Sequence, residues 1–107
     1  MIARNFNVRY SPQIYQDIQK AVDFYTEQTQ SHELGQRFVN HAENALATLK
    51  QSALHYQIRY DDIRLFPIPS FPYRAHYRVD EVSNTVFVEA IFHTREDPEE
   101  WRARTKK

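Results

Sequence analysis

The sequence predicts an α+β domain. An N-terminal strand and a helical hairpin are expected to pack on one face of a mostly antiparallel sheet of three or four strands, with a short helix at the C-terminal end. Two observations support this prediction. Residues 12–49 place apolar side chains at helical spacing in two consecutive segments, and residues 63–93 alternate apolar and polar side chains. Because the helices are grouped along the chain and the strands follow them, they are expected to form separate layers.

The composition fits one modest domain. The chain has 107 residues, of which 41% are hydrophobic and 26% are charged, and we treat residues 1–107 as a single domain. Fourteen basic residues balance fourteen acidic ones. Because general nucleic-acid binders usually carry a basic excess, direct sequence-specific DNA binding is not expected.

The amino-acid composition argues against several kinds of functional site and against a membrane-spanning segment. The chain has no cysteine, which excludes a disulfide framework, a thiolate nucleophile and a cysteine-ligated metal. His32, His41 and His55 show no ligand spacing, so neither a metal nor another cofactor is expected. No uncharged apolar run approaches the roughly 20 residues of a membrane-spanning helix, and the first ten residues lack a signal-peptide core. We therefore expect a soluble, cytoplasmic protein.

The chain begins with a predicted strand and helix. Residues 6–10 alternate aromatic or aliphatic side chains with polar ones, which indicates a short strand. Ser11 and Pro12 then supply an N-cap and a proline at the first helical position. The apolar stripe of this helix consists of Ile14, Ile18, Ala21, Val22 and Tyr25, widened by Tyr15 and Phe24.

A polar link at residues 27–32 leads to a second predicted helix. Gly35, the only glycine, lies in the first turns of that helix, where glycine costs about 1 kcal/mol relative to alanine. We expect a close crossing with the first helix to compensate, rather than a flexible hinge. The inner stripe consists of Leu34, Phe38, Ala42, Ala45 and Leu49.

After Leu54 the apolar period changes from that of a helix to that of a strand. Residues 56–60 could form a short extended piece, and residues 63–68 a further strand. Pro67 and Pro69 are expected to end that strand, because proline cannot donate a ladder hydrogen bond.

Residues 73–80 and 86–93 predict the two main strands. Glu89 decides how the last strand is oriented, because an unpaired carboxylate is costly to bury. The side predicted to face the core holds Tyr73, Ala75, Tyr77 and Val79 on the first strand and Val86, Val88, Ala90 and Phe92 on the second. The other side, called the open face below, holds Arg74, His76, Arg78 and Asp80 together with Phe87, Glu89, Ile91 and His93.

A short final helix is predicted from residue 98 onward. Asp97 is its expected N-cap and Pro98 its first residue. Arg102, Arg104 and Lys106 lie where a helix C-terminus favours cations. Trp101 is expected to pin this helix onto the sheet.

A series of short motifs points to a known superfamily. The motifs are the Ser-Pro helix start, an Arg37-Phe38 step in the helical hairpin, Arg64 on a strand, the segment Phe71-Pro72-Tyr73-Arg74 continuing to Tyr77 and Val79, and finally His93, Arg95, Pro98 and Trp101. In this order and at this length, the chain resembles the RelE/ParE superfamily of toxins from bacterial type II toxin–antitoxin modules.

The resemblance implies a small cytoplasmic protein that arrests growth when free and is held inactive by a cognate antitoxin. RelE-like relatives cut mRNA in the ribosomal A site, whereas ParE-like relatives poison DNA gyrase and have no established hydrolytic site. This chain has no lysine between Lys50 and Lys106 and no tyrosine after Tyr77, and its net charge is zero. These departures from the RelE-like pattern favour the ParE-like branch.

The resemblance also suggests two alternative sets of site residues. For a metal-independent endoribonuclease, Arg64, Arg74 and His93 are the candidate catalytic residues, because arginines stabilise phosphate charge and histidine transfers protons. For binding to a protein target, interfaces combine arginine and aromatic anchors. That set is Arg64, Arg74, Arg78, Phe87, Ile91, His93 and Arg95.

Purely structural roles remain open for the same residues. The arginines could form cross-strand pairs with Asp80 or Glu89, and His93 could hydrogen-bond a strand end. His76 is expected at the surface. Arg64 joins the other arginines only if its side chain points outward.

Four alternative functions follow. The first is a toxin that binds an essential target, with DNA gyrase the leading candidate, and the second is a ribosome-dependent mRNA endonuclease. The third is a non-toxic or decayed antitoxin-binding module, and the fourth is an unrelated small α+β domain. For the first three we expect an antitoxin that covers the helical hairpin and augments a sheet edge.

Overall fold

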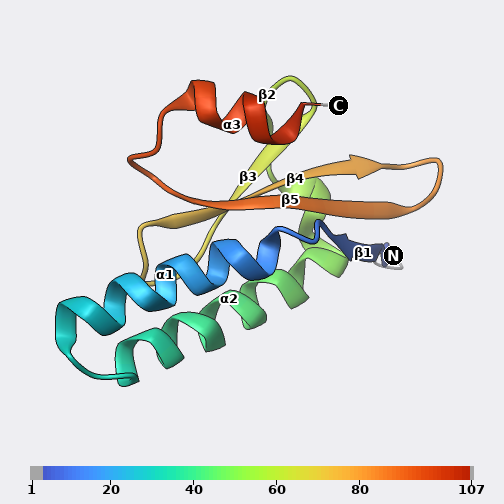
Figure 1. The fold of residues 1–107 in the computed structure, drawn as a ribbon. Coiled ribbons are helices and arrows are strands. Elements are labelled where there is room, and N and C mark those ends of the chain that lie inside the picture. Colours follow the sequence, from blue (N-terminus) through green and yellow to red (C-terminus); the bar gives the residue numbers. More distant parts are fainter. Residues whose placement is uncertain (1–3, 107) are drawn as a thin grey trace.

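The computed structural model describes residues 4–106 and confirms the predicted α+β class. One mostly antiparallel sheet lies between two helical layers (Figure 1). The elements are β1 (Asn7–Tyr10), α1 (Ile14–Thr29), α2 (Glu33–Ser52), the 3-10 turn η1 (Ala53–His55), β2 (Ile58–Tyr60), β3 (Ile63–Pro67), β4 (Tyr73–Asp80), β5 (Thr85–His93) and α3 (Pro98–Thr105).

The sheet has five strands in the order β1-β5-β4-β3-β2, because both short strands join it. β1 runs parallel to β5, and the other neighbours are antiparallel. The hairpin of α1 and α2 covers one face, and α3 lies on the other (Figure 1). Below, these are called the hairpin face and the α3 face. Among the described residues, no helix is both long and apolar enough to span a membrane.

The first helix begins two residues later than predicted. The Ser11 hydroxyl accepts a hydrogen bond from the Gln13 backbone N–H at 3.3 Å, and the Ser11 carbonyl accepts one from Ile14 N–H at 3.0 Å. Residues 12 and 13 therefore form a turn that leads into α1. The helix ends at Thr29, and its C-cap residue Gln30 has a φ of 54°, which lets the Gln30 N–H donate back to the carbonyl of Thr26.

The close crossing predicted at Gly35 is confirmed. A Cβ atom at this position would lie 3.0 Å from Val22 Cγ1 and 3.3 Å from the Val22 carbonyl oxygen. Because any side chain here would push α1 away, the missing Cβ is what lets the two helices approach.

The main core lies between the hairpin and the sheet. Phe38 and Tyr77 are inaccessible to solvent, and the Tyr77 hydroxyl donates a 2.6 Å hydrogen bond to the Ala53 carbonyl. Tyr15 and Phe24 do not widen the buried stripe of α1 as predicted. They are 76% and 49% exposed, because only the narrower stripe around Ala21 faces the sheet.

A β-bulge changes the orientation of the second half of β5. Tyr77 pairs with Val88 but His76 pairs with Ala90, so Glu89 is an extra residue between two ladder positions. Val86 and Val88 face the hairpin core as predicted. The predicted orientation is wrong after the bulge: Ile91 turns to the hairpin core, and Ala90 and Phe92 turn toward α3.

Candidate functional site

The centre of the predicted open face is covered by α3. Asp97 caps this helix, since its carboxylate accepts a 2.9 Å hydrogen bond from Glu99 N–H, and Pro98 begins it as predicted. Trp101 is 7% exposed, and its ring lies 5.0 Å from that of His76 and 5.7 Å from that of Tyr60. The predicted pinning role of Trp101 is confirmed. The face is therefore not open over its full length.

His76 is buried beneath this helix and not at the surface as predicted. Its Nδ1 atom lies 3.0 Å from the Tyr60 hydroxyl, and its Nε2 atom has no hydrogen-bond partner in the described part of the chain. Burial, and then the positive charge of Arg74, lower the pKa of His76 to about 3. The imidazole is therefore neutral at physiological pH.

The predicted arginine set is divided between the two faces. Arg64 pairs across the ladder with Tyr77, which belongs to the hairpin core, so it lies on the hairpin face. Its guanidinium donates to the Tyr56 carbonyl. Arg74 and Arg78 lie on the opposite face, and Arg64 therefore does not join them.

Arg78 forms one of the cross-strand pairs considered for it. Its guanidinium lies 4.2 Å from the centre of the Phe87 ring, and its Nε atom is 3.9 Å from the Glu89 carboxylate. The side chains of Arg78 and Glu89 are only 19% and 17% exposed. Arg78 and Phe87 thus form a stacked pair on the part of the β4–β5 hairpin that leads to its turn.

Arg74 has a different environment. Its guanidinium lies 5.4 Å from the centre of the Trp101 ring, and its Nε atom is buried without a hydrogen-bond partner. Within residues 4–106 it forms no ion pair. Burial, and then the charge of Arg59, lower its pKa.

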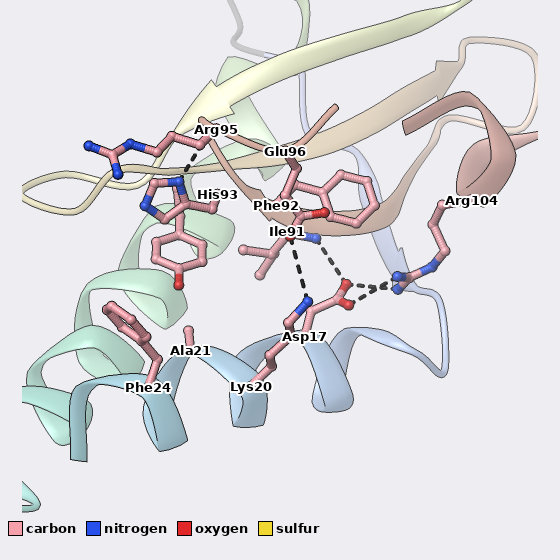
Figure 2. Close-up of a pocket in the computed structure, with 11 residues that line it drawn as sticks. Asp17, Lys20, Ala21, Phe24, Ile91, Phe92, His93, Arg95, Glu96 and Arg104 are labelled. Atoms are coloured by element: carbon pink, nitrogen blue, oxygen red, sulfur yellow. Dashed lines mark hydrogen bonds and ion pairs between the residues drawn. The ribbon is translucent and has the colours of Figure 1, made fainter. Parts of the chain in front are cut away.

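A cleft of about 430 Å³ opens at the end of β5, between α1 and α3 (Figure 2). His93 lies at its edge, and its Nδ1 atom accepts a 3.0 Å hydrogen bond from Arg95 N–H. The hydrogen bond at the strand end, considered above for His93, is thus present. The Arg95 side chain extends away from the cleft (Figure 2).

The cleft also contains a set of hydrogen bonds at Asp17 that joins α1, α3 and β5, and that the sequence did not predict; it is called the joint at Asp17 below. The Asp17 carboxylate accepts two hydrogen bonds from the Arg104 guanidinium, at 3.0 and 2.7 Å, and a third from Ile91 N–H at 3.0 Å (Figure 2). One side chain of α1 thus holds both α3 and the edge of β5 beyond the end of β1. The only signal in the sequence is that Asp17 lies between Ile14 and Ala21 on the inner side of the helix.

A second hollow, of about 350 Å³, lies on the outer side of the helical hairpin. Tyr10 and Tyr15, two of its residues, are 44% and 76% exposed. Burial, and then the neighbouring Tyr15, raise the pKa of Tyr10. This apolar groove is lined by Tyr10, Ile14, Tyr15, Ile18, Leu46 and Ala47, with Glu43 and Lys50 at its rim.

The three residues proposed for ribonuclease chemistry are not brought together. Arg64 lies on the hairpin face and Arg74 on the α3 face. His93 pairs across the ladder with Tyr73, so it lies on the hairpin face at the far end of β4 from Tyr77 and Arg64. In the part of the chain that the structure describes, no group of three or more histidine, aspartate and glutamate residues could hold a metal ion.

Of the remaining interface candidates, Ile91 is 3% exposed and packs in the hairpin core, so it cannot contact a target from the surface. The bulge at Glu89 is the physical reason. Phe87 is partly buried beside Arg78, as described above.

Comparison with known proteins gives a family match and a shared fold. The family model for the ParE toxin of the type II toxin–antitoxin system parDE matches residues 8–98. No curated protein matches the chain significantly.

Two solved structures share the fold. The chromosomal ParDE toxin–antitoxin system from P. aeruginosa superposes with a TM-score of 0.71 at 16% identity, covering 82% of this chain and 95% of the other. The toxin–antitoxin complex RelBE2 from Mycobacterium tuberculosis superposes with a TM-score of 0.56 at 19% identity, covering 84% and 92%.

Proposed function

The chain belongs to the family of ParE toxins of type II toxin–antitoxin systems, and on this basis we propose that it arrests growth by binding an essential protein target and that a cognate antitoxin neutralises it. DNA gyrase is the leading candidate for the target. This assignment follows the ParE-like branch of the superfamily.

The observation that carries the proposal is the covered α3 face. α3 closes the centre of the face on which RelE-like relatives carry catalytic groups, and His76 beneath it is buried and neutral. The remaining candidates for ribonuclease chemistry lie on different faces or at different ends of the sheet. With a net charge of zero, the chain also lacks the basic excess that favours binding to ribosomal RNA.

The exposed part of the β4–β5 hairpin is the surface that we propose for the target. Its turn extends beyond α3 (Figure 1), and Val82 in the turn is 99% exposed. Asp80 accepts hydrogen bonds from Val82 N–H and Ser83 N–H, which stabilise the turn. Together with the stacked Arg78 and Phe87, the hairpin offers the arginine, aromatic and aliphatic side chains that protein interfaces favour.

A supercoiling assay with purified protein tests the target. The protein is expected to block gyrase supercoiling or to trap cleaved DNA, and Arg78→Glu to weaken that effect at least about tenfold because it places a like charge beside Glu89 and removes the arginine anchor. Arg37→Ala, an exposed arginine of α2, is the matched control. An absence of any effect on gyrase at micromolar concentration contradicts the target assignment.

Induction in cells distinguishes the alternatives. mRNA cuts positioned by codon, abolished by Arg64→Ala, Arg74→Ala or His93→Ala, would identify a RelE-like endonuclease instead. Harmless overexpression without the antitoxin would identify a non-toxic or decayed binding module.

For the antitoxin, we propose that the apolar groove between α1 and α2 receives an amphipathic helix. Tyr10 and Tyr15 expose aromatic surface there, and Glu43 and Lys50 offer opposite charges at the rim. Tyr15→Glu is expected to weaken capture by the product of the adjacent open reading frame, whereas Arg78→Glu should leave it unchanged. Equal capture of both variants would place the antitoxin elsewhere.

A further inference from the structure

Arg4 lies beside the turn of the β4–β5 hairpin, residues 81–84, and all three nitrogen atoms of its guanidinium donate hydrogen bonds to that turn. Nη1 donates to the Glu81 carboxylate at 2.8 Å, Nη2 to the Glu81 carbonyl at 2.9 Å, and Nε to Asn84 Oδ1 at 3.1 Å. The guanidinium carbon also lies 4.6 Å from the centre of the Phe6 ring. Arg4 therefore joins the first and last residues of the turn.

Asn84 connects the turn to residues 5–7, where β1 begins. Its Nδ2 atom donates a 2.6 Å hydrogen bond to the Asn5 carbonyl, and its own carbonyl accepts a 2.9 Å bond from Asn7 N–H. Its φ of 54° lies in the left-handed region, which asparagine adopts more readily than most residues. The segment from residue 4 to residue 7 therefore holds the turn from the side of β1.

Val82 is the apolar side chain that this turn presents to solvent. It is 99% exposed, so its position depends on the backbone of the turn rather than on packing. Val82 N–H and Ser83 N–H both donate to the Asp80 carboxylate. On the other side of Val82, Arg4 holds the Glu81 backbone and neutralises its carboxylate. The turn thus combines a fixed backbone with an exposed apolar side chain.

Global stability does not account for the contacts of Arg4. The side chains of Arg4 and Glu81 are 43% and 60% exposed, and ion pairs at exposed positions contribute little to the free energy of folding. Holding a long arginine side chain in one rotamer also costs conformational entropy. The main physical effect of the three hydrogen bonds is therefore local, because they restrict the conformations open to residues 81–84. A preorganised turn loses less entropy when it binds, which strengthens association.

We propose that Arg4 is a positioning residue for target binding, which holds residues 81–84 in the conformation that the target protein recognises. This inference rests on the proposed function, in which the exposed part of the β4–β5 hairpin is the target surface. Arg4 acts through the turn and not through direct contact with the target. Because Arg4 neutralises Glu81, the turn offers Val82 to an apolar contact on the target.

Hydrogen exchange of the purified chain, followed residue by residue with nuclear magnetic resonance, tests the positioning. Arg4→Ala is expected to speed the exchange of Val82 N–H and Ser83 N–H at least about fivefold, and to leave the urea midpoint and the amides of α2 unchanged. Arg4→Lys should behave like Arg4→Ala, because lysine keeps the charge but loses the fork of donors. Arg37→Ala, at an exposed position of α2, is the matched control and should exchange like wild type.

Three results would overturn the proposal. Wild-type exchange rates in Arg4→Ala would show that the turn is ordered without the arginine. Wild-type rates in Arg4→Lys would show that a positive charge is sufficient and that the fork holds nothing. A lower urea midpoint in Arg4→Ala would make Arg4 a residue that stabilises the whole fold rather than one that positions the turn.

Activity measurements separate this inference from the proposed function. Arg4→Ala is expected to raise the concentration that half-inhibits gyrase supercoiling at least about fivefold, and to weaken growth arrest on induction. Equal inhibition by wild type and Arg4→Ala would refute the inference and leave the proposed function intact. If wild type arrested growth without affecting gyrase, growth arrest would give the same comparison. If wild type affected neither, the proposed function would fail, and the exchange rates would still decide whether Arg4 holds the turn.

Discussion

The two faces of the sheet are closed by different physical means. On the hairpin face, Phe38, Leu49 and Tyr77 are inaccessible to solvent in one large apolar core. On the other face an eight-residue helix is held by Trp101 and by the ion pair of its Arg104 with α1. Within residues 4–106, the buried side-chain polar atoms without a partner all belong to α3 or to β4 side chains on the α3 face: Arg74, His76, Arg78, Trp101 and Arg104.

This difference suggests different roles for the two faces, one in the stability of the fold and the other in the positioning of side chains. Apolar burial is non-directional and scales with area, so the hairpin face is expected to supply most of the free energy of folding. Hydrogen bonds and ion pairs are directional, and each unpaired buried donor costs free energy. The α3 face is therefore expected to contribute less stability and to hold specific side chains in place.

The largest expected effect is in the hairpin core. Phe38→Ala should lower the free energy of unfolding by about 4 kcal/mol, because the ring is fully buried and contacts the rings of Phe71 and Tyr73. Urea denaturation measures this loss. Phe24→Ala, at a half-exposed position of α1, is the control and should cost less than about 1 kcal/mol. A loss below about 2 kcal/mol in Phe38→Ala would break the comparison.

The next effect concerns pH and the α3 face. The pKa of His76 is about 3 in the folded chain and 6.5 ordinarily, so between these values the unfolded chain binds more protons. The contribution of neutral His76 is complete above pH 6.5 and is lost as the pH falls toward 3. Between pH 6.5 and pH 4.5 this amounts to about 2 to 3 kcal/mol, at no more than about 1.4 kcal/mol per pH unit.

Urea denaturation at both pH values measures it as the difference between wild type and His76→Gln. His55→Gln, at an exposed position, is the matched control. If His76→Gln followed the wild-type pH dependence, His76 would be accessible to protons in the folded chain.

The joint at Asp17 should have a somewhat smaller effect. Asp17→Ala is expected to cost about 2 kcal/mol, because it leaves Arg104 and Ile91 N–H without their acceptor. A double-mutant cycle with Arg104→Ala should show a coupling of about 1 kcal/mol or more. Lys20→Ala is the control, since its ion pair with Glu96 is 3.9 Å long and Lys20 is 80% exposed. Additive losses in the cycle would show that the joint does not hold α3.

The smallest effect is expected at Arg78, on the part of the β4–β5 hairpin that leads to its turn. Arg78→Ala should cost about 1 kcal/mol, because Arg78 Nε is 3.9 Å from the Glu89 carboxylate, which is long for an ion pair even though both side chains are largely buried. Thermal or urea unfolding measures this. A near-neutral result sharpens the comparison, since any loss of growth arrest in this variant then reports target binding rather than folding. A cost above about 2 kcal/mol would make Arg78 a structural residue.

The fold was largely predictable, and the reason is local. The stripes of α1 and α2, the close crossing at Gly35 and the cap at Asp97 each depend on spacing within one element or on one short motif. The candidate site was less predictable. Alternation in residues 86–93 looks unbroken in the sequence, yet the extra residue Glu89 reverses the orientation of Ile91.

By itself, the sequence determined which segments become helices and strands, where most of them end, and that two helices cross closely. Only the tertiary structure decided that α3 covers His76, that Arg64 and Arg74 lie on opposite faces, and that Asp17 holds Arg104 from 87 positions away. The physical reason is range. Periodicity reports the environment of neighbouring residues, whereas the face on which a side chain lies depends on strand register and on distant partners, and a shift of one residue changes both.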